Sequence, residues 1–226
     1  MLKAKPFIKW VGGKSQLIEQ LEAQLPADFD NWKNVTYIEP FVGGGAMLFY
    51  MLQRYPHIRR AIINDINPDL CTCYRTVRDM PEQLIEALYE VERTYLSLKT
   101  EEDRKSYFMS VREHYNEKKL NAIENTTLFF FLNRTCFNGL YRVNKKGLFN
   151  VPFGKYANPT ICDPGTIRKD SELLQQVEIL NEDFEVTFDY AHGNTLFYFD
   201  PPYRPLSNTS SFNDYTKEAF NDNAQV

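Results

Sequence analysis

Apolar residues recur along the chain at two spacings, and their order predicts the secondary structure. Residues 14–25 carry leucine and isoleucine at helical spacing and are expected to form a helix. A short strand is expected at 36–40, before a glycine-rich loop that opens a second helix, and another strand at 59–68 ends in Asn64-Asp65. A strand, a glycine loop, a helix and a strand in this order build parallel sheets.

The pattern changes after Pro68, where helical spacing dominates. Mainly helical stretches are expected at residues 69–79, 82–98, 101–118 and 121–134. Two short strand-like runs follow at 140–153, joined by Asn144-Lys145-Lys146-Gly147, a hairpin loop whose glycine suits a positive φ. The spacing typical of sheet strands returns at 177–181 and 196–200.

These patterns together predict an α/β fold that is interrupted by an insertion. Residues 1–69 and 166–226 are expected to form the α/β domain, whose sheet strands all lie outside the helical stretches. Residues 70–165 are expected to form a mostly helical insertion domain that carries the hairpin at 140–153.

The last predicted strand ends in an unusual turn, within the sequence LFYFDPPYRP. The continuous apolar run at 196–199 is typical of a strand that is covered on both faces of a parallel sheet. Pro201 and Pro202 have a fixed φ and no N–H group, so the turn after Asp200 is stiff. Asp200 and Tyr203 are therefore held at the carboxyl end of a strand, where open α/β sheets bind ligands.

Composition narrows the class of protein. Of 226 residues, 43% are hydrophobic, which is enough for a core, yet no apolar run is as long as a membrane span and the first residues lack a signal-peptide core. We therefore expect a cytoplasmic protein. Four cysteines and three histidines are scattered without paired spacing, so neither a disulfide framework nor a metal site is indicated.

The net charge of −4 argues weakly against a nucleic-acid partner, but the charges are unevenly distributed. Between Glu124 and Asp163 the chain has no acidic residue, whereas it has basic residues at Arg134, Arg142, Lys145, Lys146 and Lys155. On charge alone, a solvated basic face explains this segment as well as a nucleic-acid contact does.

The glycine-rich loop YIEPFVGGGAM at 37–47 indicates a nucleoside ligand. Glycines between a strand and a helix let the backbone approach a ligand, and Asp65 follows Gly45 by about 20 residues, where a carboxylate can accept ribose hydroxyls. A second loop, Gly12-Gly13-Lys14-Ser15, ends like a phosphate-binding loop but has Ile8 where that motif needs its first glycine. An ATPase is thus poorly supported.

With the glycine loop, Asp65 and Asp-Pro-Pro-Tyr in this order, the chain resembles the Dam family of adenine-N6 DNA methyltransferases, which belong to the alpha class and the D12 type. The matching segments are FIKWVGGK at 7–14, EPFVGGGA at 39–46, INDIN at 63–67, FNGLYRVNKKGLFNVPFGKY at 137–156, EDF at 182–184 and DPPYRPLSNTSSFNDY at 200–215. The resemblance implies a Rossmann-like sheet and transfer of a methyl group from S-adenosylmethionine to N6 of adenine in double-stranded DNA, often at GATC and typically in bacteria.

The resemblance also assigns residues to the cofactor and to catalysis. It implies cofactor contacts at Trp10, Lys14, Glu39, Phe41, Gly43, Gly45, Asp65, Asp183, Phe184 and Asp200. The catalytic segment is Asp200, Pro201, Pro202 and Tyr203. A carboxylate and a backbone carbonyl that accept both N6–H bonds expose the lone pair of that nitrogen, and the prolines fix their direction. The adenine must flip out of the duplex to reach them.

The same resemblance implies the DNA contacts. They are Lys9, Phe137, Asn138, Leu140, Arg142, Pro152, Lys155 and Tyr156. Arg142 matches an arginine that reads a guanine edge in the major groove, which suits a bidentate guanidinium. Phe137 and Asn138 match the segment that enters the space left by the flipped base, and lysines of the hairpin are expected at phosphates.

The chain departs from the family at its end. Family members continue past the matching SFNDYTKEAF with further strands, whereas this sequence stops at Val226, so we expect a C-terminally truncated enzyme. Two alternatives stay open: an inactive fragment that binds DNA or cofactor, and a methyltransferase for RNA or protein glutamine, against which Asp200 and the hairpin count. The enzyme is expected to act alone or beside a restriction endonuclease.

Overall fold

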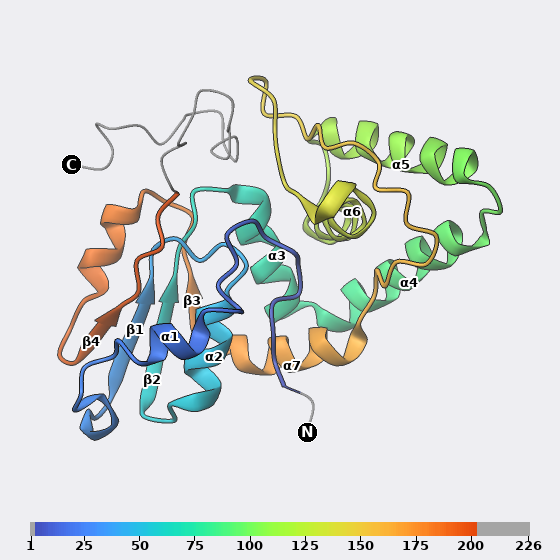
Figure 1. The fold of residues 1–226 in the computed structure, drawn as a ribbon. Helices are drawn as coiled ribbons and strands as arrows, with labels where there is room; N and C mark the ends of the chain where they lie inside the picture. Colours follow the sequence, from blue (N-terminus) through green and yellow to red (C-terminus); the bar gives the residue numbers. More distant parts are fainter. Residues whose placement is uncertain (1–2, 203–226) are drawn as a thin grey trace.

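Four parallel strands form the sheet on which the fold is built (Figure 1). The structure is a computed structural model that describes residues 3–202. The strands are β1 (Val35–Glu39), β2 (Ile58–Ile63), β3 (Val177–Ile179) and β4 (Thr195–Phe197), in the spatial order β3-β2-β1-β4. Every residue of the central strand β1 is buried, as expected for an apolar strand of a parallel sheet. The predicted α/β class with a parallel sheet is confirmed.

Because the strands are parallel, their carboxyl ends lie along one edge of the sheet. In the register, Glu39 is opposite Ile63, and Ile63 is opposite Ile179, so β1, β2 and β3 end at the same level. Ile38 is opposite Phe197, which brings the residues that follow β4 to this level as well. This edge therefore collects the chain segments in which the sequence places its candidate chemistry.

The prediction that 196–200 is a strand covered on both faces was wrong in two respects. The strand is β4, Thr195–Phe197, and it ends earlier, although Tyr198 still donates its N–H to the carbonyl of Ile38 at 2.9 Å. Its residues are half-buried, and Phe199 is 45% exposed. The reason is position: within the described residues β4 pairs with β1 alone and forms an edge of the sheet.

Helices make up most of the remaining described chain. The α-helices are α1 (Ile18–Glu22), α2 (Ala46–Arg54), α3 (Pro68–Asp79), α4 (Pro81–Ser97), α5 (Glu101–Asn116), α6 (Ala122–Thr135) and α7 (Pro164–Leu174), and the 3-10 turns are η1 (Phe29–Asn31), η2 (Phe137–Gly139) and η3 (Phe184–Tyr190). The helices predicted over the middle of the chain are confirmed as α3 to α6. The spacing did not predict α7, which begins at the cap Asp163 followed by Pro164.

The helix starts follow from local sequence. Asn67 accepts the N–H groups of Asp69 and Leu70 and so caps α3, whose first residue is Pro68. Helices α5 and α6 both begin with capping boxes, built by Thr100 with Asp103 and by Asn121 with Glu124. These caps satisfy N–H groups that the first helical turn leaves without partners.

Two other predictions need correction. The helix expected at 14–25 is α-helical only over Ile18–Glu22 and buries none of its residues, since its leucines pack at the periphery of the core. The hairpin at 140–153 turns as predicted, with Gly147 at φ +73 donating its N–H to the carbonyl of Asn144. Its arms, however, form isolated bridges, Val143 with Phe149 and Cys136 with Phe153, and no regular strands.

Helix α6 lies at the centre of the helical part and is surrounded by α3, α4 and α5 (Figure 1). Its residues Phe129, Phe130 and Phe131 are all buried, since neighbours cover this helix on every side. The N-terminal segment runs between the sheet side and α6 in the same view. There Phe7 stacks on Phe130 with ring centroids 5.4 Å apart, and Arg134 donates a hydrogen bond to the carbonyl of Phe7.

The described residues also include all four cysteines, which are buried free thiols. No helix within residues 3–202 is both long enough and apolar enough to span a bilayer.

Candidate functional site

Asp200 lies beyond the end of β4 and forms an ion pair with Lys14 across the carboxyl edge of the sheet. The ammonium nitrogen of Lys14 is 2.6 Å from Oδ2 of Asp200, and it also donates to the carbonyl of Gly12 at 2.9 Å. The side chains of Lys14 and Asp200 are only 13% and 19% exposed. The pair is therefore largely desolvated, and the ammonium stabilises the carboxylate in a place where water screens little.

Glu39, the last residue of β1, is a second carboxyl group at this edge and is 2% exposed. Tyr37 donates a hydrogen bond from its hydroxyl to Oε2 of Glu39 at 2.8 Å. Burial raises the pKa of Glu39 to about 8, an effect to which the charge of Asp200 adds and which the bond from Tyr37 opposes. The fold therefore favours the protonated form of Glu39 more than water does.

Asp65 follows β2 and holds the glycine loop. Its carboxylate accepts the N–H of Gly43 at 3.1 Å and the N–H of Asn67 at 2.9 Å. Burial raises the pKa of Asp65 to about 6, and these two backbone bonds oppose the shift. Asp65 thus contacts the glycine loop directly, although the two bonded residues are 22 positions apart in the chain.

Trp10 lies against the same loop. A Cβ atom at Gly43 would come within 2.8 Å of Cδ1 of the indole, so only glycine allows the tryptophan this close. Gly45 has φ +72 and precedes α2, and no side chain caps the helix there. In the first turn of α2, the backbone N–H of Leu48 donates to the carboxyl of Glu39, so an acceptor from the end of β1 already lies at this helix start.

Phe41 and Phe184 form an aromatic pair next to these polar groups, with ring centroids 5.3 Å apart. Asp183, beside Phe184, is exposed and accepts the N–H of Glu185, which caps η3. A half-buried aromatic pair beside the carboxylates of Asp65 and Asp200 suits a purine nucleoside that carries a cation. These residues therefore have the chemistry that S-adenosylmethionine would need, and the cation beside them, Lys14, is paired with Asp200.

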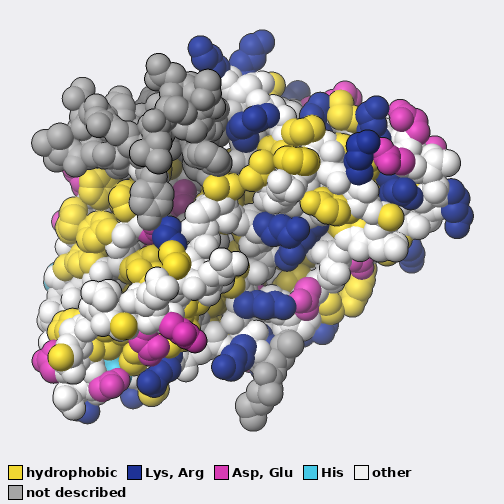
Figure 2. All heavy atoms as spheres, in the orientation of Figure 1, with side chains coloured by type: hydrophobic (Ala, Val, Ile, Leu, Met, Phe, Trp, Pro, Cys, Tyr) yellow, Lys and Arg dark blue, Asp and Glu magenta, His cyan; other side chains and the backbone are white. Residues whose placement is uncertain are grey.

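Five of the eight predicted DNA contacts lie on η2 and the hairpin. Arg142 is exposed, and its Nε donates to the side-chain oxygen of Asn150 at 2.8 Å, which holds the guanidinium across the hairpin. Phe137 is 51% exposed, and the next residue, Asn138, is exposed with φ +55. Lys and Arg side chains gather at the hairpin and continue down the face beneath it (Figure 2).

Lys9 is held against this group by the backbone. Asn133, near the end of α6, accepts the N–H of Lys9 at 2.9 Å and donates to the carbonyls of Lys9 and Gly139 at 2.8 and 3.0 Å. The ammonium of Lys9 lies 5.5 Å from the centre of the Tyr156 ring. A Cβ atom at Gly139 would meet the side chain of Lys9, so this glycine permits the contact.

The remaining predicted site residues differ in their exposure and in their contacts within the protein. Leu140 is half-buried, while Pro152 is exposed and accepts the N–H of Phe137 through its carbonyl at 2.8 Å. Lys155 forms an ion pair with Glu101 on α5 at 3.0 Å, so its charge is partly balanced within the protein. Pro201 and Pro202 are half-buried beside Asp200. Tyr203 lies outside the described residues.

Several residues that hold the site were not predicted from the sequence. They are Tyr37 below Glu39, Asn67 at the start of α3, and Asn133 beside Lys9. Asn67 carries a readable signal, because asparagine followed by proline is typical of a helix start. Tyr37 and Asn133 carry none, because their partners are set by packing. Within residues 3–202 no group of three or more His, Cys, Asp or Glu side chains is arranged to hold a metal ion.

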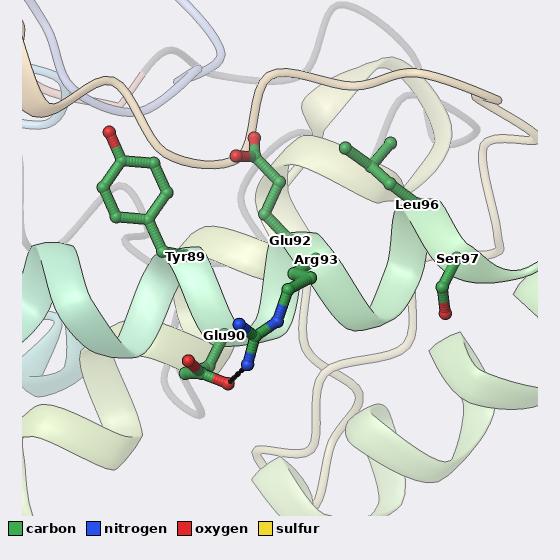
Figure 3. A pocket seen from close by; sticks show the side chains of 6 residues that line it. All are labelled: Tyr89, Glu90, Glu92, Arg93, Leu96 and Ser97. Carbon is green, nitrogen blue, oxygen red and sulfur yellow. Dashed lines mark hydrogen bonds and ion pairs between the residues drawn. The ribbon is translucent and has the colours of Figure 1, made fainter.

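A surface pocket of about 590 Å³ lies elsewhere, along α4 (Figure 3). Its lining residues are Tyr89, Glu90, Glu92, Arg93, Leu96 and Ser97. Glu92 accepts the N–H groups of Ile161 and Cys162, so it holds the segment that leads to α7. None of the predicted site residues lines this pocket, and we assign it no part in the site.

Comparison with known proteins points to the same chemistry. A sequence model of the D12 class N6 adenine-specific DNA methyltransferases matches residues 10–226. The chain is 48% identical to the type II methyltransferase M.MjaIII of Methanocaldococcus jannaschii, over all of this chain and 78% of that protein. It is 39% identical to the type II methyltransferase M1.LlaDCHI of Lactococcus lactis, over 100% of this chain and 75% of that protein. It is 33% identical to a DNA adenine methylase of Vibrio cholerae, over 97% of this chain and 73% of that protein.

Proposed function

Since the chain belongs to the family of D12 class N6 adenine-specific DNA methyltransferases, we propose that it methylates adenine within GATC in duplex DNA. The family uses S-adenosylmethionine as the methyl donor. The observation that carries the proposal is the meeting of Lys14, Asp65 and Asp200 at the carboxyl edge of one parallel sheet. The relative from Vibrio cholerae is named a DNA adenine methylase, which supports DNA as the substrate.

Asp200 is the proposed catalytic residue. Its carboxylate accepts one N6–H bond of the target adenine and the carbonyl of Pro201 accepts the other, which exposes the nitrogen lone pair. Bound S-adenosylmethionine supplies an electrophilic methyl group on a sulfonium. Once N6 has accepted the methyl group, its surplus proton would pass to solvent, while Asp200 and the carbonyl of Pro201 hold the nitrogen. Pro201 and Pro202 keep the two acceptors in place, and Tyr203 is proposed to stack on the base.

The cofactor is proposed to lie along the glycine loop. Asp65 accepts its ribose hydroxyls, and Phe41 and Phe184 contact its adenine. Trp10, Glu39, Gly43, Gly45 and Asp183 complete the pocket. Lys14 has two proposed roles: its ammonium stabilises Asp200 before the cofactor binds, and it pairs with the carboxylate of the methionine portion afterwards.

The hairpin is proposed to recognise the target sequence in the DNA. Arg142 reads a guanine edge as a fork of two donors, while Leu140, Pro152 and Tyr156 contact the bases or backbone of the site. Phe137 and Asn138, both exposed on η2, enter the space left by the flipped adenine. Lys9 contacts the outer base pair and Lys155 a phosphate, which requires that Lys155 exchange Glu101 for DNA.

The division into domains follows the same roles. Residues 1–69 and 166–226 are proposed to bind the cofactor and catalyse transfer, and residues 70–165 to recognise the target. Two of the relatives are named type II methyltransferases, which supports a restriction endonuclease of the same specificity as a partner in the cell.

Replacement of Asp200 tests the catalytic assignment. Asp200→Ala should abolish methyl transfer and leave S-adenosylmethionine binding within about tenfold, because the carboxylate acts on the base. Transfer from labelled cofactor to a GATC duplex and calorimetric binding measure the two effects. Asp189→Ala, an exposed aspartate on η3, is the matched control and should stay active. Near-normal turnover of Asp200→Ala would exclude Asp200 from catalysis.

Replacement of Arg142 tests the target sequence. Arg142→Ala should reduce discrimination against one guanine substitution by roughly 1–3 kcal/mol, because the two donors to that base are lost. The measurement is kcat/KM on GATC and on each single-base variant, with N6-methyladenine identified in the product. Lys145→Ala, at the exposed hairpin tip, is the control and should weaken the binding of all these duplexes by the same factor. Wild-type methylation that ignores the GATC sequence would contradict this specificity.

A further inference from the structure

Tyr141 lies next to Arg142 in the chain but points the other way, into the core. Its side chain is buried, with 6% exposed, and its ring stacks on Trp10 with centroids 5.4 Å apart and on Phe129 at 5.2 Å. Its hydroxyl donates to Oδ2 of Asp69 at 3.3 Å. One residue of the hairpin therefore contacts both the N-terminal segment and the start of α3.

Through Trp10, Tyr141 reaches the glycine loop. The indole packs so closely on Gly43 that a Cβ there would overlap it, and Tyr74 fixes the loop from the other side by donating to the carbonyl of Gly43 at 3.0 Å. The glycine loop, Trp10 and Tyr141 therefore form one continuous set of contacts.

Through Asp69, Tyr141 reaches Asp65. Asn67 donates its N–H to the carboxylate of Asp65 and accepts the N–H of Asp69 with its side chain, so the turn from β2 into α3 is one hydrogen-bonded unit. Oδ2 of Asp69 also accepts from Tyr115 and from Lys118, each at 2.6 Å. Asp69 is thus a fixed and charge-balanced acceptor on which the hairpin rests.

We infer that Tyr141 is a positioning residue that couples the cofactor pocket to the placement of Arg142, so that cofactor and DNA each bind more tightly when the other is bound. The inference rests on the proposed function, which assigns the pocket to S-adenosylmethionine and Arg142 to a guanine. The physical reason is preorganisation: a hairpin already anchored at Tyr141 loses less conformational freedom when it meets DNA. Coupling between two binding equilibria is necessarily reciprocal.

Tyr141→Phe tests this inference because it removes the hydroxyl and keeps the ring. Calorimetry measures the Kd of a GATC duplex with and without saturating S-adenosylhomocysteine, which cannot donate a methyl group. In the wild type we expect the cofactor analogue to tighten duplex binding by roughly tenfold, within the usual range of coupling between sites. In Tyr141→Phe this factor should fall to about twofold or less, and the KM for the duplex should rise by a larger factor than kcat falls.

Tyr115→Phe is the matched control. It removes another hydroxyl from the same oxygen of Asp69, at a shorter distance, while its ring on α5 keeps its edge-on contact with Phe149 of the hairpin. It should lower the free energy of unfolding at least as much as Tyr141→Phe does and keep the coupling of the wild type. Wild-type coupling in Tyr141→Phe, or equal loss in both variants, overturns the inference and leaves the proposed function intact. Absence of duplex and cofactor binding in the wild type overturns the proposed function and this inference together.

Discussion

At the scale of single residues, buried carboxyl groups set the electrostatics of this protein. Asp170 on α7 is fully buried; its Oδ1 accepts the N–H of Lys5 at 3.0 Å, and its Oδ2 has no hydrogen-bond partner among residues 3–202. Burial raises the pKa of Asp170 to about 8, against an ordinary value of 3.8, and the charge of Asp163 adds to the shift. The fold therefore binds this proton more tightly than the unfolded chain does.

The raised pKa of Asp170 predicts a pH dependence of stability. Its contribution is fully present below the ordinary value of 3.8 and is lost as the pH rises through about 8, since the charged form is disfavoured in the fold. Asp170→Asn keeps an acceptor for Lys5 and removes the charge, so it should make the fall in stability between roughly pH 5 and pH 9 shallower. Urea unfolding at several pH values across this range measures how the free energy of unfolding depends on pH. An unchanged slope would contradict the prediction, as would an equal effect of the exposed Asp189→Asn.

At the scale of elements, the N-terminal segment joins parts of the fold that lie far apart in the sequence. Ala4 exchanges hydrogen bonds with Gln53 on α2, Lys5 donates to Asp170 on α7, and Lys9 is held by Asn133 on α6. The segment has no regular secondary structure, so side chains of these helices satisfy its backbone groups. Its position fixes both Lys9, which contacts the Tyr156 ring, and Trp10, which stacks on Tyr141.

Replacement of Asn133 tests how strongly α6 holds the N-terminal segment. Asn133→Ala removes three hydrogen bonds and leaves the part-buried backbone groups of Lys9 and the buried carbonyl of Gly139 without this partner, so it should destabilise the protein by about 2–4 kcal/mol. Asn121→Ala, at the exposed start of the same helix, should cost only about 1 kcal/mol as the loss of a cap. Chemical denaturation compares the two, and equal losses would show that Asn133 acts only locally on α6.

At the scale of the whole molecule, residues from the N-terminal segment and from the ends of β1, β2 and β4 meet at one edge of the sheet. Lys14 pairs with Asp200 across 186 positions of sequence, and Asp65 holds Gly43 across 22. A ligand that binds this edge contacts segments that are distant in the unfolded chain. Its binding free energy is therefore linked to folding of the whole molecule.

This linkage predicts that S-adenosylmethionine raises thermal stability. At a cofactor concentration one hundred times its Kd, the free energy of unfolding should rise by about 2.7 kcal/mol, because the unfolded chain lacks the site. For a chain of this size each kcal/mol corresponds to roughly 2–4 °C in Tm. Circular-dichroism melts record the shift, and methionine at the same concentration serves as the control. Equal shifts with both compounds would exclude a nucleoside-specific pocket.

The sequence by itself determined what depends on local backbone energetics. Apolar spacing predicted the sheet strands β1 to β3 and the helices α3 to α6, because burial on one face or on both imposes a period on the side chains. The glycine loop and Asp65 were both predicted at carboxyl ends of strands, since the order strand, loop, helix and strand brings consecutive carboxyl ends together. The stiff turn at Asp200 followed from the fixed φ of its two prolines.

Only the tertiary structure decided which distant residues meet. It gave β4 an edge position with half-buried residues, brought Lys14 to Asp200, and placed Tyr141 between Trp10 and Asp69. None of these contacts is encoded by a spacing along the chain, because each depends on how helices and strands pack across the sheet and around α6. The sequence thus determined the elements and the chemical groups they carry, whereas long-range packing decided their partners and burial, and hence their pKa values.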